Sequence, residues 1–151
     1  MTTTTAHESF VIERHYPASP ERVFAAWSDP SAKARWFAGP NEWIEYERGF
    51  DFRVGGSEHL KGKHPSGVVS TYDSRYMDIV KDRRIVCVYD MHLDDKRISV
   101  SLATIELEPA GTGTRLRYTE QGAFLDGYDD AGSRERGTQG LFDQLERHLA
   151  R

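Results

Sequence analysis

Apolar and polar residues alternate along much of the chain with a period of two, which is the pattern of β-strands that have one buried face. In the first such segment, Phe10 and Ile12 lie at alternate positions with Val11 between them. The pattern predicts strands at residues 8–16, 43–46, 50–60, 68–80, 84–92, 97–108 and 114–121. The links between the later strands are too short for crossover connections, so we expect about seven antiparallel strands.

Two short helices are predicted between the first two strands. The segment 19–21 (Ser-Pro-Glu) is a helix start, because serine caps the first turn, proline fits its first position and a carboxylate favours the positive end of the helix. Asp29-Pro30 ends this helix and begins a shorter one, which Gly39-Pro40 stops. Later in the chain, Gly55-Gly56 falls inside the predicted strand 50–60 and indicates a bulge or a sharp bend, and residues 61–66 read as a polar turn.

The C-terminal segment 133–150 has the period of an amphipathic helix. One apolar stripe runs along it, made of Leu141, Phe142, Leu145 and Leu149. A strand, two short helices, a run of antiparallel strands and one long helix predict an α+β domain in which the helix packs on a curved sheet. We expect a short flexible tail at residues 1–8 and a single domain over residues 9–151.

Composition narrows the class of protein. The chain has 151 residues, of which 38% are hydrophobic and 11% aromatic, so it can form one sizeable core. Its net charge of −4 argues against a nucleic-acid partner, and no apolar run is long enough for a membrane span. The N-terminus lacks the pattern of a signal peptide, and the single Cys87 cannot form an internal disulfide. We therefore expect a cytoplasmic location.

Several segments together resemble a known family. They are residues 23–27 (VFAAW), 35–37 (RWF), 52–56 (FRVGG), 113–116 (GTRL) and 141–145 (LFDQL). The order of elements is similar to the helix-grip fold of the START and Bet v 1-like (SRPBCC) superfamily. Within it, the chain resembles the branch of Activator of Hsp90 ATPase homologue 1-like and polyketide cyclase-like proteins, over about residues 9–150.

The resemblance implies a helix-grip fold: a curved antiparallel sheet of about seven strands wrapped around a long C-terminal helix, with two short helices after the first strand and a pocket inside. It does not imply one reaction, because family members include ligand carriers, enzymes and chaperone cofactors. One position departs from the family pattern. Many members carry Gly-Trp at the start of the last helix, where this chain has Gly137-Thr138.

Alternation and helical periodicity together predict which side chains line a cavity between the sheet and the long helix. We expect an aromatic rim and an inward-facing set, with few polar groups, as a flat apolar ligand requires. The candidates are Trp36, Phe37, Trp43, Phe52, Val54, Tyr76, Tyr89, Met91, Tyr118, Glu120, Arg134, Thr138 and Phe142.

Three of these candidates are polar, and each has two interpretations. Glu120 shares the inward face of the last strand with Tyr118, where a carboxylate in an apolar cup could act as an acid or base. Alternatively, it sits at the strand end and pairs with Arg53 or a backbone amide. Thr138 and Arg134 either face the cavity, or Thr138 bonds to a carbonyl one turn back and Arg134 projects into solvent.

The sequence favours no metal site and no cofactor. The six histidines lack the spacing of a metal motif, although His59 and His92 could meet across strands, and no phosphate-binding or dinucleotide motif is present. Cys87 alternates with valines and is expected to be buried and inert. The segment 124–132 is interpreted as a helix-entry loop capped by Asp130 or Ser133, as a lid over the pocket, or as an oligomer contact.

Three functions remain open at this point. The leading one is binding of a small apolar or aromatic molecule in the cavity. The second is a cyclase or hydrolase in which Glu120 acts as acid or base, helped by Tyr76, Tyr118 or Arg53. The third is a protein-interaction module that resembles a co-chaperone domain. Dimers are common for such folds, so a homodimer is a further expectation.

Overall fold

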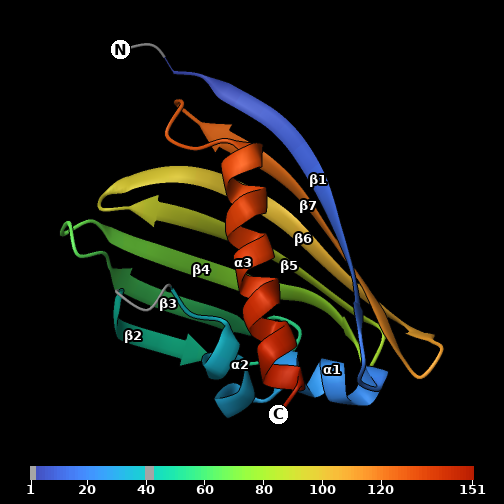
Figure 1. Cartoon of the computed structure of the whole chain (residues 1–151). Helices are drawn as coiled ribbons and strands as arrows, with labels where there is room; N and C mark the ends of the chain where they lie inside the picture. Colours follow the sequence, from blue (N-terminus) through green and yellow to red (C-terminus); the bar gives the residue numbers. More distant parts are fainter. Residues whose placement is uncertain (1–2, 40–42) are drawn as a thin grey trace.

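The computed structural model describes residues 3–39 and 43–151 and shows a sheet folded around one long helix (Figure 1). Within these residues, seven antiparallel strands lie in the order β1-β7-β6-β5-β4-β3-β2. Strands β2 to β7 form a meander, and β1 completes the sheet by pairing with β7. The strands are β1 (Thr5–Tyr16), β2 (Ile44–Phe50), β3 (Ser57–Lys63), β4 (Val69–Val80), β5 (Arg84–Leu93), β6 (Lys96–Ala110) and β7 (Gly113–Leu125).

Three helices accompany the sheet in the described part of the chain. The helices α1 (Pro20–Ser28) and α2 (Pro30–Trp36) follow β1, and α3 (Ala131–Leu149) crosses the concave face of the sheet (Figure 1). The α+β helix-grip fold predicted from the sequence is therefore confirmed. None of the helices within residues 3–39 and 43–151 is both long and apolar enough to cross a bilayer.

Side-chain caps begin the helices at the predicted places. Ser19 accepts a hydrogen bond from the backbone N–H of Arg22, and a proline occupies the first turn of both short helices. Asp130 caps α3 by accepting from the Ser133 backbone N–H at 2.8 Å. Each cap satisfies a backbone donor that has no partner within the helix, which fixes where the helix starts.

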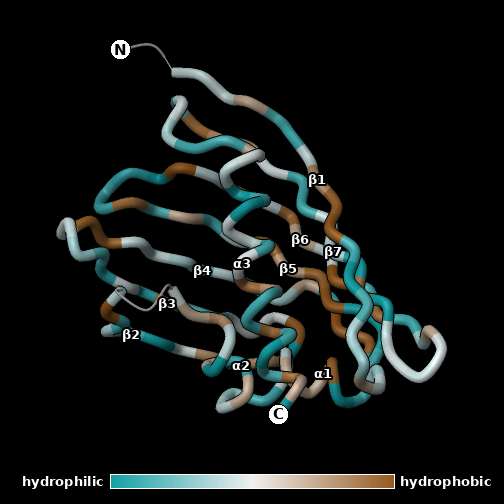
Figure 2. Tube along the Cα trace, viewed as in Figure 1, coloured by the Kyte–Doolittle hydropathy of each residue, from teal (hydrophilic) through white to brown (hydrophobic). Residues whose placement is uncertain are grey.

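Helix α3 is held to the sheet along its length. Its buried face carries Phe142, Leu145 and Leu149, as the apolar stripe predicted. The Tyr16 hydroxyl donates to the Phe142 carbonyl at 3.1 Å, and Arg14 of β1 pairs with Asp143 of α3 at 3.0 Å. Figure 2 shows hydrophobic stretches in the middle of the strands and hydrophilic residues at their turns. The core thus lies between the sheet and the three helices.

Several element boundaries differ from the sequence prediction. Residues 51–56 form a tight turn between β2 and β3, so Gly55-Gly56 does not lie inside a strand. Gly55 has φ +85°, and a Cβ on Gly56 would lie 2.2 Å from the Asp51 carbonyl oxygen. These two constraints explain the paired glycines, because a side chain would be strained at the first and would clash at the second.

Strand pairing also moves three other boundaries. Strand β1 begins at Thr5, within the segment expected as a tail, because residues 5–9 pair with residues 121–125. The same pairing places Phe124 in β7 rather than in the helix-entry loop. Strand β3 continues to Lys63 into the expected polar turn, and Pro40 of the expected helix stop lies outside the described residues.

Candidate functional site

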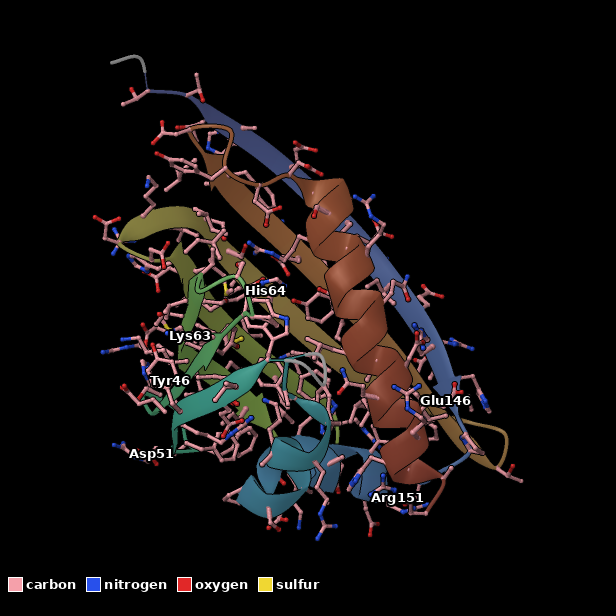
Figure 3. The ribbon with its side chains drawn as sticks, turned by 60° about the vertical axis from the view of Figure 1, so that its left-hand side comes forward. Tyr46, Asp51, Lys63, His64, Glu146 and Arg151 are labelled. Atoms are coloured by element: carbon pink, nitrogen blue, oxygen red, sulfur yellow. The ribbon has the colours of Figure 1, made fainter. Side chains whose placement is uncertain are left out.

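A cavity of about 530 Å³ lies between the concave face of the sheet and α3. Figure 3 shows α3 running along the sheet, with Glu146 and Arg151 toward its C-terminal end and Tyr46, Lys63 and His64 on the side of β2 and β3. All three tryptophans of the chain line the cavity. Ten of the thirteen residues predicted from the sequence also line it, namely Trp36, Phe37, Trp43, Tyr76, Tyr89, Met91, Tyr118, Arg134, Thr138 and Phe142.

The wall of the cavity is a continuous series of aromatic rings. From α2 it runs through Trp36 and Phe37, whose ring centroids are 5.7 Å apart, to Tyr72 of β4 at 5.0 Å from Phe37. Tyr89 of β5 follows at 4.9 Å from Tyr72, and Trp27 of α1 packs edge-on against Trp36 at 4.7 Å. Most of these contacts are edge-to-face, the geometry that aromatic side chains favour. The result is a broad apolar wall that suits a flat or aromatic molecule.

Glu120 points inward from β7, as the alternation predicted, but its carboxylate is not among the cavity-lining groups. Its Oε1 accepts from the Tyr118 hydroxyl at 2.6 Å, and its Oε2 accepts from the hydroxyls of Tyr89 and Ser101, each at 2.7 Å. The side chain is 1% exposed. The alternative pairing with Arg53 does not occur, because Arg53 is exposed and bonds to Asp51.

Arg134 of α3 turns inward and completes this cluster. Its Nη1 donates to the Tyr89 hydroxyl at 2.9 Å and to Glu120 Oε2 at 3.3 Å. Its Nη2 donates to Ser99 Oγ at 2.7 Å and to Asp129 Oδ2 at 3.0 Å. Arg134 therefore joins α3 to β5, β6 and β7 and to the segment that enters the helix, instead of projecting into solvent.

The protonation states in this cluster support its role as a fixed network. Burial raises the pKa of the Tyr89 hydroxyl well above its ordinary value, and the negative charge of Glu120 raises it further. Burial likewise raises the pKa of Tyr118. Burial alone lowers the pKa of the Arg134 guanidinium, but Tyr89, Glu120 and Asp129 raise it by more, so the net shift is upward. The tyrosines thus remain hydrogen-bond donors and the arginine remains charged.

Thr138 combines the two interpretations drawn from the sequence. Its hydroxyl donates to the Arg134 carbonyl at 2.9 Å, one turn back along α3, so the hydroxyl is satisfied within the helix. The residue nevertheless lines the cavity. It therefore presents a small, internally satisfied side chain to the cavity.

A second polar cluster in the cavity wall was not predicted from the sequence. Lys33 of α2 is 3% exposed, and its Nζ donates to Glu58 Oε1 at 2.9 Å. The Tyr76 hydroxyl donates to the same oxygen at 2.7 Å. Two spacings could have indicated this pair, because Lys33 is three residues before the buried Trp36 on one helix face and Glu58 is two residues before Leu60 on one strand face.

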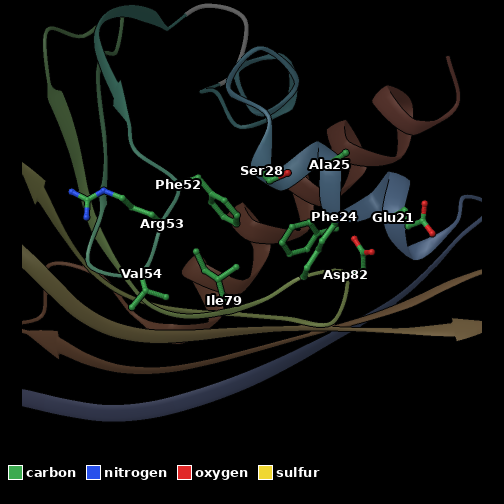
Figure 4. A pocket seen from close by; sticks show the side chains of 10 residues that line it. Glu21, Phe24, Ala25, Ser28, Phe52, Arg53, Val54, Ile79 and Asp82 are labelled. Atoms are coloured by element: carbon green, nitrogen blue, oxygen red, sulfur yellow. The ribbon is translucent and has the colours of Figure 1, made fainter.

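The remaining two candidates, Phe52 and Val54, line a different hollow. This second hollow has a volume of about 540 Å³ and lies between α1 and the 51–54 turn (Figure 4). Phe24 and Ile79 complete its apolar floor, and charged side chains such as Glu21 stand at its rim (Figure 4). Val54 is 57% exposed, because the turn that carries the paired glycines bends it away from the cavity under α3.

The histidines and Cys87, considered from the sequence as metal ligands or a reactive group, do not lie together in one site. His59 bonds to Asp73 and Glu47 on the β2 side of the sheet, apart from His92, which lies opposite Thr71. Across residues 3–39 and 43–151, no cluster of three metal-ligating side chains is present. Cys87 is buried, as expected, and its burial raises the pKa of its thiol.

The comparisons with known proteins agree with this architecture. Residues 17–150 match the family described as Activator of Hsp90 ATPase homolog 1-like protein. The comparison with curated proteins gives no match.

Among solved structures, an uncharacterized protein from Rhizobium leguminosarum is 44% identical, with a TM-score of 0.95 and 99% of both chains covered. The protein Mll3558 from Rhizobium loti is 46% identical over 96% of this chain and 99% of its own, with a TM-score of 0.89. An AHSA1-like protein from Aeromonas hydrophila, at 22% identity, a TM-score of 0.73 and coverage of 95% and 92%, shares the fold.

The family match covers most of the chain, from the first short helix to the end of α3, and begins just after β1. The protein therefore belongs to the family of Activator of Hsp90 ATPase homolog 1-like proteins, within the helix-grip superfamily SRPBCC.

Proposed function

We propose that the protein binds a small apolar or aromatic molecule in the cavity between the sheet and α3. The observation that carries this proposal is the cavity itself, about 530 Å³ in volume and walled by aromatic rings. This volume falls within the range of roughly 300–1,000 Å³ that is usual for small-molecule sites. The family fold is that of ligand-binding domains, which supports the same function.

The position of Glu120 favours binding over catalysis. Both of its oxygens accept hydrogen bonds from protein groups, and its carboxylate stands behind Tyr89 and Arg134 rather than at the cavity surface. An acid or base must reach the proton that it transfers, directly or through one water molecule. Glu120 meets that requirement only if its network opens, so we assign it to holding the cavity wall.

Fluorescence of N-phenyl-1-naphthylamine tests this proposal. This neutral aromatic probe is dark in water and bright in an apolar site, and it can be excited directly. We expect saturable enhancement with the wild-type protein and a rise in melting temperature with probe concentration, because a ligand of the native state stabilises it.

A matched pair of variants locates the binding. Thr138→Trp puts a large ring on the cavity side of α3, whereas Arg147→Trp puts the same ring on an exposed position of the same helix. We expect the first to weaken probe binding at least about tenfold by filling the cavity and the second to leave it unchanged. Equal binding by both variants would place the probe elsewhere and remove the proposal.

A further inference from the structure

Two cations line the cavity, the buried Lys33 and the largely buried Arg134, and each has a glutamate behind it. Lys33 is backed by Glu58 and Arg134 by Glu120, and neither glutamate lines the cavity. At both places the cavity wall presents a nitrogen donor with a glutamate held behind it, and Asp129, the second carboxylate partner of Arg134, lines the cavity itself. The two cations differ in how many of their donors the protein uses.

The terminal nitrogens of Arg134 are fully engaged. Nη1 donates to Tyr89 and Glu120, and Nη2 donates to Ser99 and Asp129. Each of these nitrogens carries two hydrogens, so four acceptors use all four of them. This cation is committed to joining α3 to the sheet, and a ligand could recruit its terminal nitrogens only by breaking one of those bonds.

Lys33 is not saturated in this way. An ammonium group has three hydrogens, and Glu58 Oε1 is the one acceptor found for Lys33 Nζ among the described residues. Its other neighbours are the faces of aromatic rings, with centroids 4.5 to 5.7 Å from Nζ, belonging to Phe37, Trp27, Phe50 and Trp36. These rings attract a cation but do not replace an oxygen acceptor. Donor capacity therefore remains at this end of the cavity.

The charge at this end indicates what kind of acceptor fits. Lys33 and Glu58 are 3% and 2% exposed and neutralise each other. An anionic ligand group would add a second negative charge to an apolar, buried setting, which is costly without its own partner. An uncharged oxygen adds no net charge and still accepts a hydrogen bond from the ammonium group.

Building on the proposed binding function, we propose that Lys33 selects ligands that carry an uncharged carbonyl oxygen on an aromatic framework. The oxygen accepts from Lys33 Nζ, and the framework lies along the aromatic wall formed by Trp36, Phe37 and Tyr72. Glu58 and Tyr76 are positioning residues, because Glu58 accepts from the ammonium group and the Tyr76 hydroxyl holds that Glu58 oxygen in place. Aromatic ketones, esters and amides make up this ligand class.

Three compounds of nearly equal shape test the inference by equilibrium dialysis. They are 2-acetylnaphthalene, 2-isopropylnaphthalene, which lacks the oxygen, and 2-naphthoate, which is an anion. The variants are Lys33→Met and the charge-neutral pair Lys33→Met with Glu58→Gln, which avoids leaving Glu58 unpaired if the single variant fails to fold. Binding of the hydrocarbon by a variant shows that its cavity is intact.

The measured quantity is the preference for the ketone, taken as the dissociation constant of the hydrocarbon divided by that of the ketone. We expect this ratio to fall roughly tenfold to a hundredfold from wild type to the double variant, as for loss of a hydrogen bond to a charged group. An unchanged ratio overturns the inference but leaves the proposed function standing. If naphthoate binds more tightly than the ketone and this binding is lost in Lys33→Met, the ligand group is an anion and the proposal of an uncharged oxygen is overturned. Absence of binding by the ketone and the hydrocarbon to the wild type removes both proposals.

Discussion

Replacing Arg134 by methionine should destabilise the protein strongly, because this largely buried side chain joins α3 to three strands of the sheet. The substitution retains the apolar stem and removes four hydrogen bonds, two of them to carboxylates. It also leaves Glu120, which is 1% exposed, without its cationic partner. The substitution therefore breaks an ion pair that is shielded from solvent, and not one on the surface.

The size of the effect follows from that burial. Removing one member of a buried ion pair costs about 3–5 kcal/mol, since the remaining charge stays desolvated. For a domain of this length, such a loss lowers the melting temperature by roughly 6 to 20 °C. Glu120→Gln should cost less, about 1–2 kcal/mol, because Arg134 keeps Asp129 as a partner and the amide oxygen still accepts hydrogen bonds.

Urea unfolding of both single variants and of the double variant Arg134→Met with Glu120→Gln measures the interaction. We expect the double variant to be more stable than the sum of the single losses predicts by about 1–3 kcal/mol, because the orphaned charge is gone. Strict additivity of the two losses would show that Arg134 and Glu120 do not act as a pair. A loss below about 1 kcal/mol for Arg134→Met would place that side chain in solvent.

Three further predictions concern other parts of the fold. Lys33→Met alone should destabilise by about 3–5 kcal/mol and be partly rescued by adding Glu58→Gln, as measured by urea unfolding; a double variant no more stable than the single one would contradict a buried pair. Gly56→Ala should lower the urea midpoint more than Gly55→Ala. The first substitution creates a clash with the Asp51 carbonyl, whereas the second creates about 1 kcal/mol of backbone strain. The reverse order of the two midpoints would refute the turn geometry. Burial and neighbouring arginines lower the pKa of His148 below 6.5, so the stability that this residue contributes above pH 6.5 is lost as the pH falls through its folded-state pKa. His148→Gln should therefore flatten the decline in urea midpoint between about pH 7 and pH 5. An unchanged decline would exclude the effect.

Periodicity predicted most of the fold because the protein follows simple local rules. The alternation of Phe10 and Ile12, the cap at Ser19 and the stripe that includes Phe142 each report a local preference that the tertiary structure keeps. The boundaries that moved depend on long-range pairing. Strand β1 starts at Thr5 only because Leu125, far along the chain, is its partner.

The candidate site was predictable in its apolar part and less so in its polar part. Inward-facing aromatic residues follow from alternation, so Tyr89 and Tyr118 were found in the sequence. Lys33 and Glu58 were missed because each is an ordinary surface residue by type, and only their pairing across 25 positions makes burial affordable. Val54 was misplaced because residues 51–56 form a turn between β2 and β3, in which the alternation of a strand does not apply.

Binding in the space between α3 and the sheet can be observed directly. The most direct measurement is an NMR experiment that records intermolecular nuclear Overhauser effects between 2-acetylnaphthalene and the methyl groups of the protein. We predict contacts to the methyl groups of Thr138, Met91 and Ala103, which line the cavity under α3. Contacts to Val54 and Ile79 without any contact to Thr138 or Met91 would place the molecule in the second hollow and contradict binding under α3.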